Sequence, residues 1–264
     1  MEYKVSIIGF GHVGKAMKLI FDDWVTAIRD PMIEESASIS QVNKTDVAFI
    51  CVPTPMNKDG SCDVSIVEDV ASQINPPLII IKSTIEPGTT DNLRLKYKKN
   101  IVFSPEYFGE SSYYIPPEWA PKGWPFHIFG GDKKDTAKCV EIFKPKFSPR
   151  TFYYQTDAKT AEIIKYMENV WGAMKVTFAN EFYEACKYLG ANFDEVREGW
   201  ALDPRVEKMH TAVYENSRGF GGKCFPKDLM AFIRSCESAG YDPKLLKEIW
   251  NSNARFRGEK QEDF

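Results

Sequence analysis

A glycine-rich turn near the start of the chain limits the possible folds most strongly. Gly9, Gly11 and Gly14 follow the apolar run KVSIIGF and lead into a helical pattern, VGKAMKLIFDD. In such a unit the first glycine makes a tight turn, the second lets the backbone approach a pyrophosphate, and the third lets the helix pack on the strand. The N–H groups at the helix start favour a phosphate. The spacing therefore predicts a dinucleotide site.

An aspartate closes the second apolar run, WVTAIRD, at the distance that such a site requires. Asp30 follows the glycines by about 20 residues, where a carboxylate can hold an adenosine ribose. The same carboxylate repels a 2'-phosphate, which favours NAD over NADP, although the adjacent Arg29 keeps NADP open. A structural glycine turn with a helix-capping aspartate is the alternative interpretation.

Short apolar runs alternate with helical patterns through the first part of the chain, and helical patterns alone follow. Runs such as DVAFICVP and PLIIIKST read as buried strands, so the pattern indicates a mainly parallel sheet covered on both faces. We expect an α/β chain with a Rossmann-like, NAD-binding domain over residues 1–156. An all-helical domain for substrate binding and dimerisation is expected over residues 157–264.

Composition excludes several classes of function. The 264 residues carry a net charge of -3 with scattered basic residues, which gives no argument for a nucleic-acid partner. The N-terminus lacks a signal-peptide pattern, and no apolar run approaches the roughly 20 residues that span a bilayer. The six cysteines show no metal-like spacing. We therefore expect reduced cysteines, a cytoplasmic location, no membrane contact and no metal, with Cys62 exposed in a polar turn.

Two patterns in the second part could carry chemistry. The stretch GFGGKCFPKD, residues 219–228, surrounds one cysteine with glycines and cations, which permit close approach and favour a thiolate. Cys224 is either a reactive sulfur on a loop or a buried cysteine in an ordinary turn. Lys165 and Asn169 lie four residues apart in a helical pattern and share one face, as do many pairs on surface helices.

Taken in order, GxGxxG, VPTP, KSTIEPGTT, SPEYFGE, the Lys165/Asn169 pair, DPRV and GFGGKCFPKD resemble the nucleotide-sugar 6-dehydrogenases. The chain looks closest to the UDP-glucose 6-dehydrogenases, and the resemblance covers nearly its whole length. It implies a four-electron oxidation of a nucleotide sugar, UDP-glucose to UDP-glucuronate, with NAD and without metal. It also implies a role in polysaccharide biosynthesis and a homodimer formed through the helical domain.

The resemblance assigns catalytic roles residue by residue. Cys224 captures the aldehyde as a thiohemiacetal, which a second hydride transfer converts to a thioester. Glu106 assists hydrolysis of that thioester by water. Lys165 and Asn169 stabilise the negative oxygen at the reacting carbon, and Asp228 works with them and with the ordered water.

Other matched positions contact cofactor or substrate. Thr84 contacts cofactor and water, while the remaining cofactor contacts are Thr54, Glu110 and Lys227. Beyond Glu106, Lys165 and Asn169, the substrate contacts are Arg205, His210 and Gly221, with Arg205 reaching a substrate in the neighbouring subunit.

The chain departs from the family pattern in three places. Relatives carry a third, nucleotide-binding domain, which this sequence is expected to lack, and about 24 residues between Asp30 and Thr54 leave room for one fewer strand–helix unit. The segment before Cys224 is longer than usual, and its His210, Tyr214 and Arg218 could replace lost nucleotide contacts. Two other functions stay open: a single-step hydroxyacid or 6-phosphogluconate-type dehydrogenase, and an NAD-binding protein without catalysis.

Overall fold

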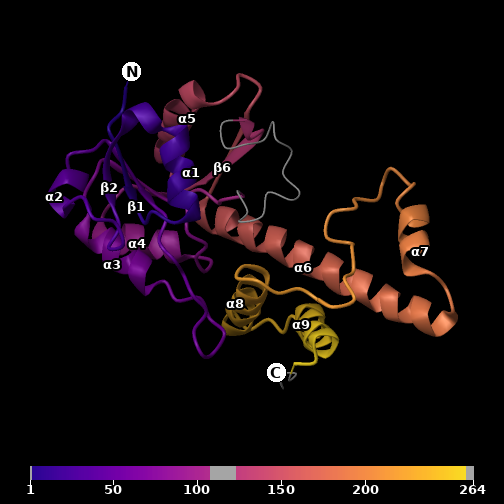
Figure 1. The fold of residues 1–264 in the computed structure, drawn as a ribbon. Coiled ribbons are helices and arrows are strands. Elements are labelled where there is room, and N and C mark those ends of the chain that lie inside the picture. Colours follow the sequence, from indigo (N-terminus) through magenta and orange to yellow (C-terminus); the bar gives the residue numbers. More distant parts are fainter. Residues whose placement is uncertain (1, 108–122, 260–264) are drawn as a thin grey trace. The chain divides into compact units, whose positions relative to one another are not determined.

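The computed structural model describes residues 2–107 and 123–259, which divide into two compact units. Unit 1 comprises Met1–Pro55 and Cys62–Lys165, and unit 2 comprises Met56–Ser61 and Tyr166–Phe264. Figure 1 labels some of their helices and strands, which are numbered in the order of the chain.

Strands and helices alternate in unit 1 (Figure 1). The strands are β1 (Val5–Ile8), β2 (Val25–Arg29), β3 (Val47–Ile50), β4 (Leu78–Ile81), β5 (Ile101–Phe103), β6 (Phe126–Gly130) and β7 (Phe152–Thr156). The helices are α1 (His12–Ile20), α2 (Ile39–Val42), α3 (Ser65–Gln73), α4 (Thr89–Tyr97) and α5 (Lys133–Phe143), with short 3-10 turns at Asp22–Trp24 and Lys144–Lys146.

The strands form one sheet in the order β2-β1-β3-β4-β5-β6-β7. Neighbouring strands run parallel, except that β5 and β6 are antiparallel. This confirms the predicted Rossmann-like, mainly parallel sheet. The strand order reverses at β1, which lies between β2 and β3, and sheets of this kind bind ligands beyond the carboxyl ends of the strands at such a reversal. In the described part of the chain β2 forms one edge of the sheet, as expected from the short first segment.

Helices cover both faces of this sheet, as the continuous apolar runs predict. Successive strand residues point to opposite faces. Ile7 and Phe49, paired across β1 and β3, enter a cluster with residues of α1 and α5. Ile8 and Ile50 enter a second cluster with residues of α2, α3 and α4. Because both faces are buried, the carboxyl ends of the strands are left to carry polar function.

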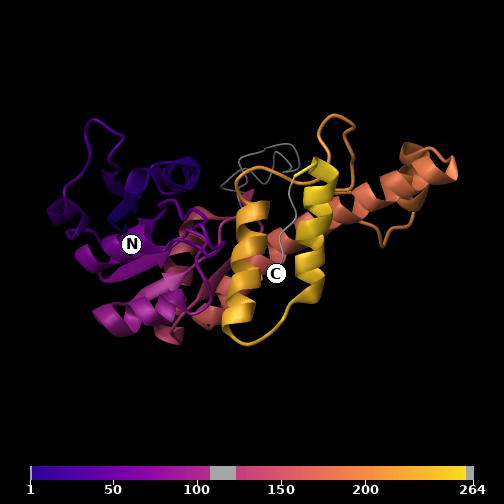
Figure 2. The same cartoon turned by 90° about the horizontal axis from the view of Figure 1, so that it is seen from below.

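Unit 2 is helical. Most of the long helix α6 (Ala158–Leu189) belongs to it, together with α7 (Phe193–Trp200), α8 (Phe225–Ser238) and α9 (Lys244–Arg257). Helices α8 and α9 lie side by side in both views (Figures 1 and 2). Their apolar faces meet α6 in a core that contains Ala173, Leu229 and Ile249. Within residues 2–107 and 123–259, no helix is both long and apolar enough to cross a bilayer.

A buried carboxyl covers the start of α4 in unit 1. Glu162, near the start of α6, accepts hydrogen bonds from the backbone N–H groups of Gly88 at 2.5 Å and Thr90 at 2.9 Å. Burial raises its pKa from 4.5 to about 7, although these hydrogen bonds act in the opposite direction. The folded chain therefore holds this proton more tightly than an unfolded chain does.

We expect the free energy of unfolding of the wild type, relative to that of Glu162→Gln, to fall as the pH rises from 5 to 8. The pKa of Glu162 is higher in the folded chain than in the unfolded chain. The stabilisation that its carboxyl contributes is therefore complete below pH 4.5 and is lost as the pH rises through 7. The full loss amounts to about 3 kcal/mol. Urea unfolding of both proteins at several pH values measures it, and identical pH dependence would contradict it.

Candidate active site

The glycine turn follows the carboxyl end of β1 (Figure 1). Gly9 has a φ of +88°, a conformation that favours glycine, and its N–H donates to the carbonyl of Arg29 at 2.9 Å. A side chain on Gly14 would place its Cβ 2.1 Å from the carbonyl oxygen of Gly9. The first and third glycines are therefore required by the protein's own packing.

Gly11 meets a different requirement. Among the described residues, no atom lies within 4 Å of the position that a Cβ on Gly11 would take. Folding therefore does not demand glycine there, whereas a pyrophosphate approaching the backbone does. Asp30 lies beside the turn, because its carboxylate accepts from the N–H groups of Phe10 at 2.6 Å and Met32 at 2.8 Å. These residues fit an NAD cofactor.

Two threonines follow neighbouring parallel strands, β3 and β4. The hydroxyl of Thr54 donates to the carbonyl of Thr84 at 2.7 Å, so the structure brings these two predicted cofactor contacts together. Cys62 lies beside them, and the prediction that it is exposed is wrong. Its thiol is 3.6 Å from the carbonyl oxygen of Thr84, and its N–H donates to Glu86 at 2.9 Å. The polar residues around Cys62 therefore did not reveal that its own thiol packs within unit 1.

Glu106 follows β5 and is buried beside a lysine. Its carboxylate oxygen lies 3.3 Å from Nζ of Lys82, and both side chains are less than a tenth exposed. Lys82 also donates to the hydroxyl of Ser104 at 3.2 Å and to the carbonyl of Pro105 at 3.3 Å. Sequence reasoning gave Lys82 no role. A lysine that ends the apolar run PLIIIK signals a buried cation, which requires a partner.

Lys165 lies on α6, at the end of unit 1. Its Nζ is 5.0 Å from the centre of the Tyr107 ring, within the range of a cation–π contact. The N–H of Tyr107 donates to the carboxylate of Glu106 at 2.8 Å. Tyr107 therefore contacts two of the predicted catalytic residues. Glu110, a predicted cofactor contact, lies outside the described residues.

In unit 2, Cys224 lies immediately before α8 as its N-cap residue. It is exposed, and Pro226 occupies the first turn of the helix that follows. The partial positive charge at a helix N-terminus favours the thiolate form of a cysteine. One turn later, the N–H of Asp228 donates to the carbonyl of Cys224 at 2.9 Å. The sequence therefore places the thiol at the start of a well-formed helix.

A polar cluster surrounds Asp228, which is almost fully buried. One carboxylate oxygen accepts a hydrogen bond from the side-chain amide of Asn169, and the other pairs with the ammonium group of Lys227. Asn169 comes from α6, whereas Lys227 and Asp228 belong to the first turn of α8. Unit 2 thus brings three of the predicted residues together, one helical turn from Cys224.

Two predicted substrate contacts lie in the segment between α7 and α8. Arg205 is exposed and pairs with Asp203. His210 adopts a φ of +63°, uncommon outside glycine, and its ring meets the edge of Phe225 with centroids 5.2 Å apart. Burial lowers the pKa of His210, with a smaller contribution from the charge of Lys175. His210 is therefore held near the first residue of α8.

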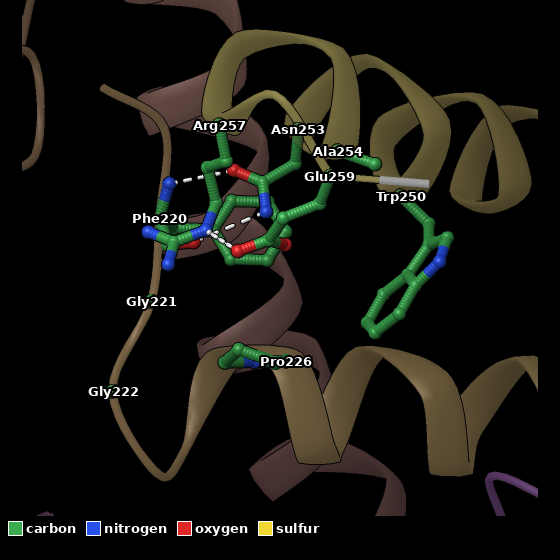
Figure 3. Close-up of a pocket in the computed structure, with 9 residues that line it drawn as sticks. All are labelled: Phe220, Gly221, Gly222, Pro226, Trp250, Asn253, Ala254, Arg257 and Glu259. Carbon is green, nitrogen blue, oxygen red and sulfur yellow. Dashed lines mark hydrogen bonds and ion pairs between the residues drawn. The ribbon is translucent and has the colours of Figure 1, made fainter. Parts of the chain in front are cut away.

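The third predicted substrate contact, Gly221, lines a pocket in unit 2 (Figure 3). A Cβ on Gly221 would lie 2.9 Å from the guanidinium of Arg257, which itself donates to Glu259 at 2.6 Å. Asn253 also reaches this loop from α9 (Figure 3). The pocket lies beside Gly221 and Gly222, in the loop that leads to Cys224.

Arg218, predicted as a replacement nucleotide contact, is engaged within unit 2. Its guanidinium donates to the side-chain oxygen of Asn180 at 2.7 Å and to Glu184 at 2.6 Å. It also lies over the ring of Tyr183, 4.3 Å from its centre. These contacts fasten the end of the segment between α7 and α8 to helix α6.

Comparison with known proteins gives consistent results for both parts of the chain. Residues 22–115 match the NAD-binding domain of the UDP-glucose/GDP-mannose dehydrogenase family, and residues 159–255 match the central domain of that family. The UDP-glucose 6-dehydrogenase of Rickettsia prowazekii (strain Madrid E) is 32% identical over 222 residues, which cover 79% of this chain and 49% of that protein. UDP-glucose 6-dehydrogenase TuaD of Bacillus subtilis (strain 168) is 31% identical over 234 residues, which cover 83% and 48%. The chain spans about half the length of these curated relatives.

Solved structures agree on the fold. A UDP-glucose dehydrogenase from the hyperthermophilic archaeon Pyrobaculum islandicum superposes with a TM-score of 0.81 at 26% identity, covering 97% of this chain and 68% of that one. The 3-hydroxyisobutyrate dehydrogenase of Mycobacterium tuberculosis, at 17% identity and a TM-score of 0.70, shares the fold over 99% of this chain and 96% of its own.

Proposed function

Because the chain belongs to the UDP-glucose/GDP-mannose dehydrogenase family, we propose that it oxidises the primary alcohol of a nucleotide sugar to a carboxylate, with UDP-glucose as the first candidate substrate. The family assignment makes the chain an oxidoreductase of the nucleotide-sugar dehydrogenase type with NAD as its cofactor. The observation that carries the proposal is the buried cluster of Asn169, Lys227 and Asp228 beside Cys224. A hydroxyacid dehydrogenase needs no thiol at this place.

Cys224 acts as the nucleophile in this proposal. Its sulfur forms a bond to the aldehyde carbon left by the first oxidation, which gives a thiohemiacetal. NAD, when bound, accepts the hydride of each oxidation, so two molecules are reduced for each carboxylate formed. After the second oxidation the carbon is a thioester on Cys224. Water then breaks the carbon–sulfur bond, supplies the new oxygen and returns the thiol.

Polar side chains assist these steps in the proposal. Lys165 and Asn169 donate to the oxygen that becomes negative at the reacting carbon, and a well-placed donor of this kind contributes about 3–4 kcal/mol. Asp228 orients Asn169 through their hydrogen bond. Glu106, held beside Lys82, takes a proton from the water that attacks the thioester.

The remaining assignments rest on the resemblance. We propose that residues 1–156 bind NAD, that residues 157–264 bind substrate and form the dimer, and that the enzyme works in the cytoplasm for polysaccharide biosynthesis. Thr54, Thr84, Glu110 and Lys227 are assigned to the cofactor, and Arg205, His210 and Gly221 to the substrate.

An NADH-coupled screen of UDP-glucose, GDP-mannose and UDP-N-acetylmannosamine tests the substrate. We expect the highest kcat/KM with UDP-glucose, and two NADH for each UDP-glucuronate formed. One NADH per sugar, unaffected by loss of Cys224, would instead support a single-step dehydrogenase. NAD binding without turnover of any of these sugars would support an NAD-binding protein without catalysis.

Exposed aromatic side chains support the proposed homodimer. Trp171, Phe178 and Phe182 lie along α6, each nearly half exposed. Trp200 of α7 adds to this surface, with its ring centre 6.0 Å from that of Phe178. Contiguous apolar surface of this kind commonly marks a protein interface. We therefore propose that two copies of the chain bury this aromatic face against each other.

The double substitution Phe178→Glu and Phe182→Glu is expected to convert the dimer to a monomer, because it places charges in the apolar interface. Light scattering coupled to gel filtration measures the mass. Met32→Glu is the matched control, since Met32 is an exposed apolar side chain of unit 1, and its mass should equal that of the wild type. A monomeric wild type, or a dimeric double variant, would contradict the interface.

A further inference from the structure

A buried asparagine on α9 holds the backbone that leads to Cys224. The N–H of Phe220 donates to Oδ1 of Asn253 at 2.6 Å, and Nδ2 of Asn253 donates back to the carbonyl of Phe220 at 3.0 Å. Figure 3 shows both bonds joining α9 to the loop. Asn253 is 5% exposed, so this pair of hydrogen bonds is shielded from water. One side chain thus satisfies both backbone groups of Phe220.

A second buried asparagine, Asn180, holds Gly219, the residue before Phe220. Oδ1 of Asn180, on α6, accepts from the N–H of Gly219 at 3.2 Å and from Nε of Arg218 at 2.7 Å. Its Nδ2 donates to the carbonyl of Val176 at 2.9 Å, which fixes the orientation of the amide. Residues 218–220 are therefore fastened to α6 and to α9.

The fit at this point is close. Gly219 has a φ of +69°, and a Cβ there would lie 2.4 Å from Oδ1 of Asn253. The side chain of Phe220 is buried in the core that contains Leu229 and Ile233 of α8. Three residues then separate Phe220 from Cys224, the N-cap residue of α8. The backbone is thus held on both sides of Cys224, at Phe220 by Asn253 and beyond Cys224 by the packing of α8.

We propose that Asn253 is a positioning residue for Cys224. By holding the backbone of Phe220, Asn253 fixes the place of the thiol. This inference rests on the proposed function. The first oxidation, from alcohol to aldehyde, needs no thiol, whereas the second proceeds from the thiohemiacetal at Cys224. A displaced thiol therefore impairs the second oxidation more than the first, and aldehyde escapes before capture.

Two variants test this role. Asn253→Ala removes both hydrogen bonds, while Asn253→Asp keeps the acceptor for the Phe220 N–H and turns the donor into an acceptor facing the carbonyl. If Asn253→Ala does not fold, Asn253→Asp alone still tests the role. Ser252→Ala is the matched control, because the Ser252 hydroxyl is a buried group of α9 that bonds Glu248 on the same helix.

Turnover with UDP-glucose in the presence of hydroxylamine, which traps aldehydes, gives the first readout. We expect NADH per sugar consumed to fall from two towards one in both Asn253 variants, with trapped aldehyde. The carboxylate rate, measured without hydroxylamine because that reagent also cleaves thioesters, should be about 100-fold lower. The control should keep a ratio of two. A merely structural role would lower the rate and leave the ratio at two, which overturns the inference.

Alkylation of Cys224 by iodoacetamide near pH 7 gives a second readout that needs no substrate. A thiol displaced from the helix N-terminus loses stabilisation of its thiolate, so we expect the Asn253 variants to react at least about threefold more slowly than wild type and control. Wild-type rates in both variants overturn the inference. If the wild type itself forms one NADH per sugar, the proposed function fails, and the alkylation rates still decide the role of Asn253.

Discussion

Replacing Cys224 with serine is expected to abolish the second oxidation while NAD still binds. Serine fits the exposed N-cap position, but its hydroxyl is a far weaker nucleophile than a thiolate. We expect carboxylate formation to fall by at least about 10³-fold, as is typical when a covalent nucleophile is removed. NADH and carboxylate yields, measured together, give the result.

The matched control for this change is Cys236→Ser. Cys236 lies on the same helix, and burial raises the pKa of its thiol, so it is a poor candidate for a nucleophile. Its variant should keep two NADH per carboxylate. If Cys224→Ser also kept two NADH per carboxylate, Cys224 would not be the nucleophile. The reaction would then use another nucleophile or proceed without a covalent intermediate.

The second large effect separates two glycines of the dinucleotide turn. Gly14→Ala should destabilise unit 1 by about 3 kcal/mol or more, because its Cβ would collide with the carbonyl oxygen of Gly9. Gly11→Ala should unfold like the wild type, since no described atom approaches its Cβ position, yet it should bind NAD at least about tenfold more weakly. Thermal unfolding and calorimetric titration with NAD measure the two quantities.

The opposite pattern would refute this division of roles. Wild-type NAD affinity in Gly11→Ala would show that the cofactor does not approach the backbone there. Wild-type stability in Gly14→Ala would show that the turn relaxes to accept a methyl group.

The fold class could be predicted from the sequence because the strands are continuous apolar runs and the helices are amphipathic or long. The expectation that Asp228 works with Asn169 came from the resemblance and not from spacing, and in the structure the two side chains form a hydrogen bond. The same three-glycine spacing could not separate the roles of Gly11 and Gly14, which depend on what each Cβ would meet.

Contacts between distant segments were the part that local patterns could not supply. Lys82 pairs with Glu106, and Asn253 holds Phe220 from 33 residues away. Local polarity misled at Cys62, because the turn that contains it packs against the carbonyl of Thr84. Each of these features depends on tertiary packing, which brings together residues with no shared periodicity.

The mass of the peptide that contains Cys224, measured after reaction with UDP-glucose and NAD, tests whether Cys224 forms a covalent bond to the sugar. Glu106→Gln should slow hydrolysis, so a thioester between Cys224 and the oxidised sugar should accumulate in that variant. We expect an adduct on Cys224 that requires NAD and is absent when Cys224→Ser is combined with Glu106→Gln. Carboxylate formation by Glu106→Gln with an unmodified Cys224 throughout turnover would contradict it.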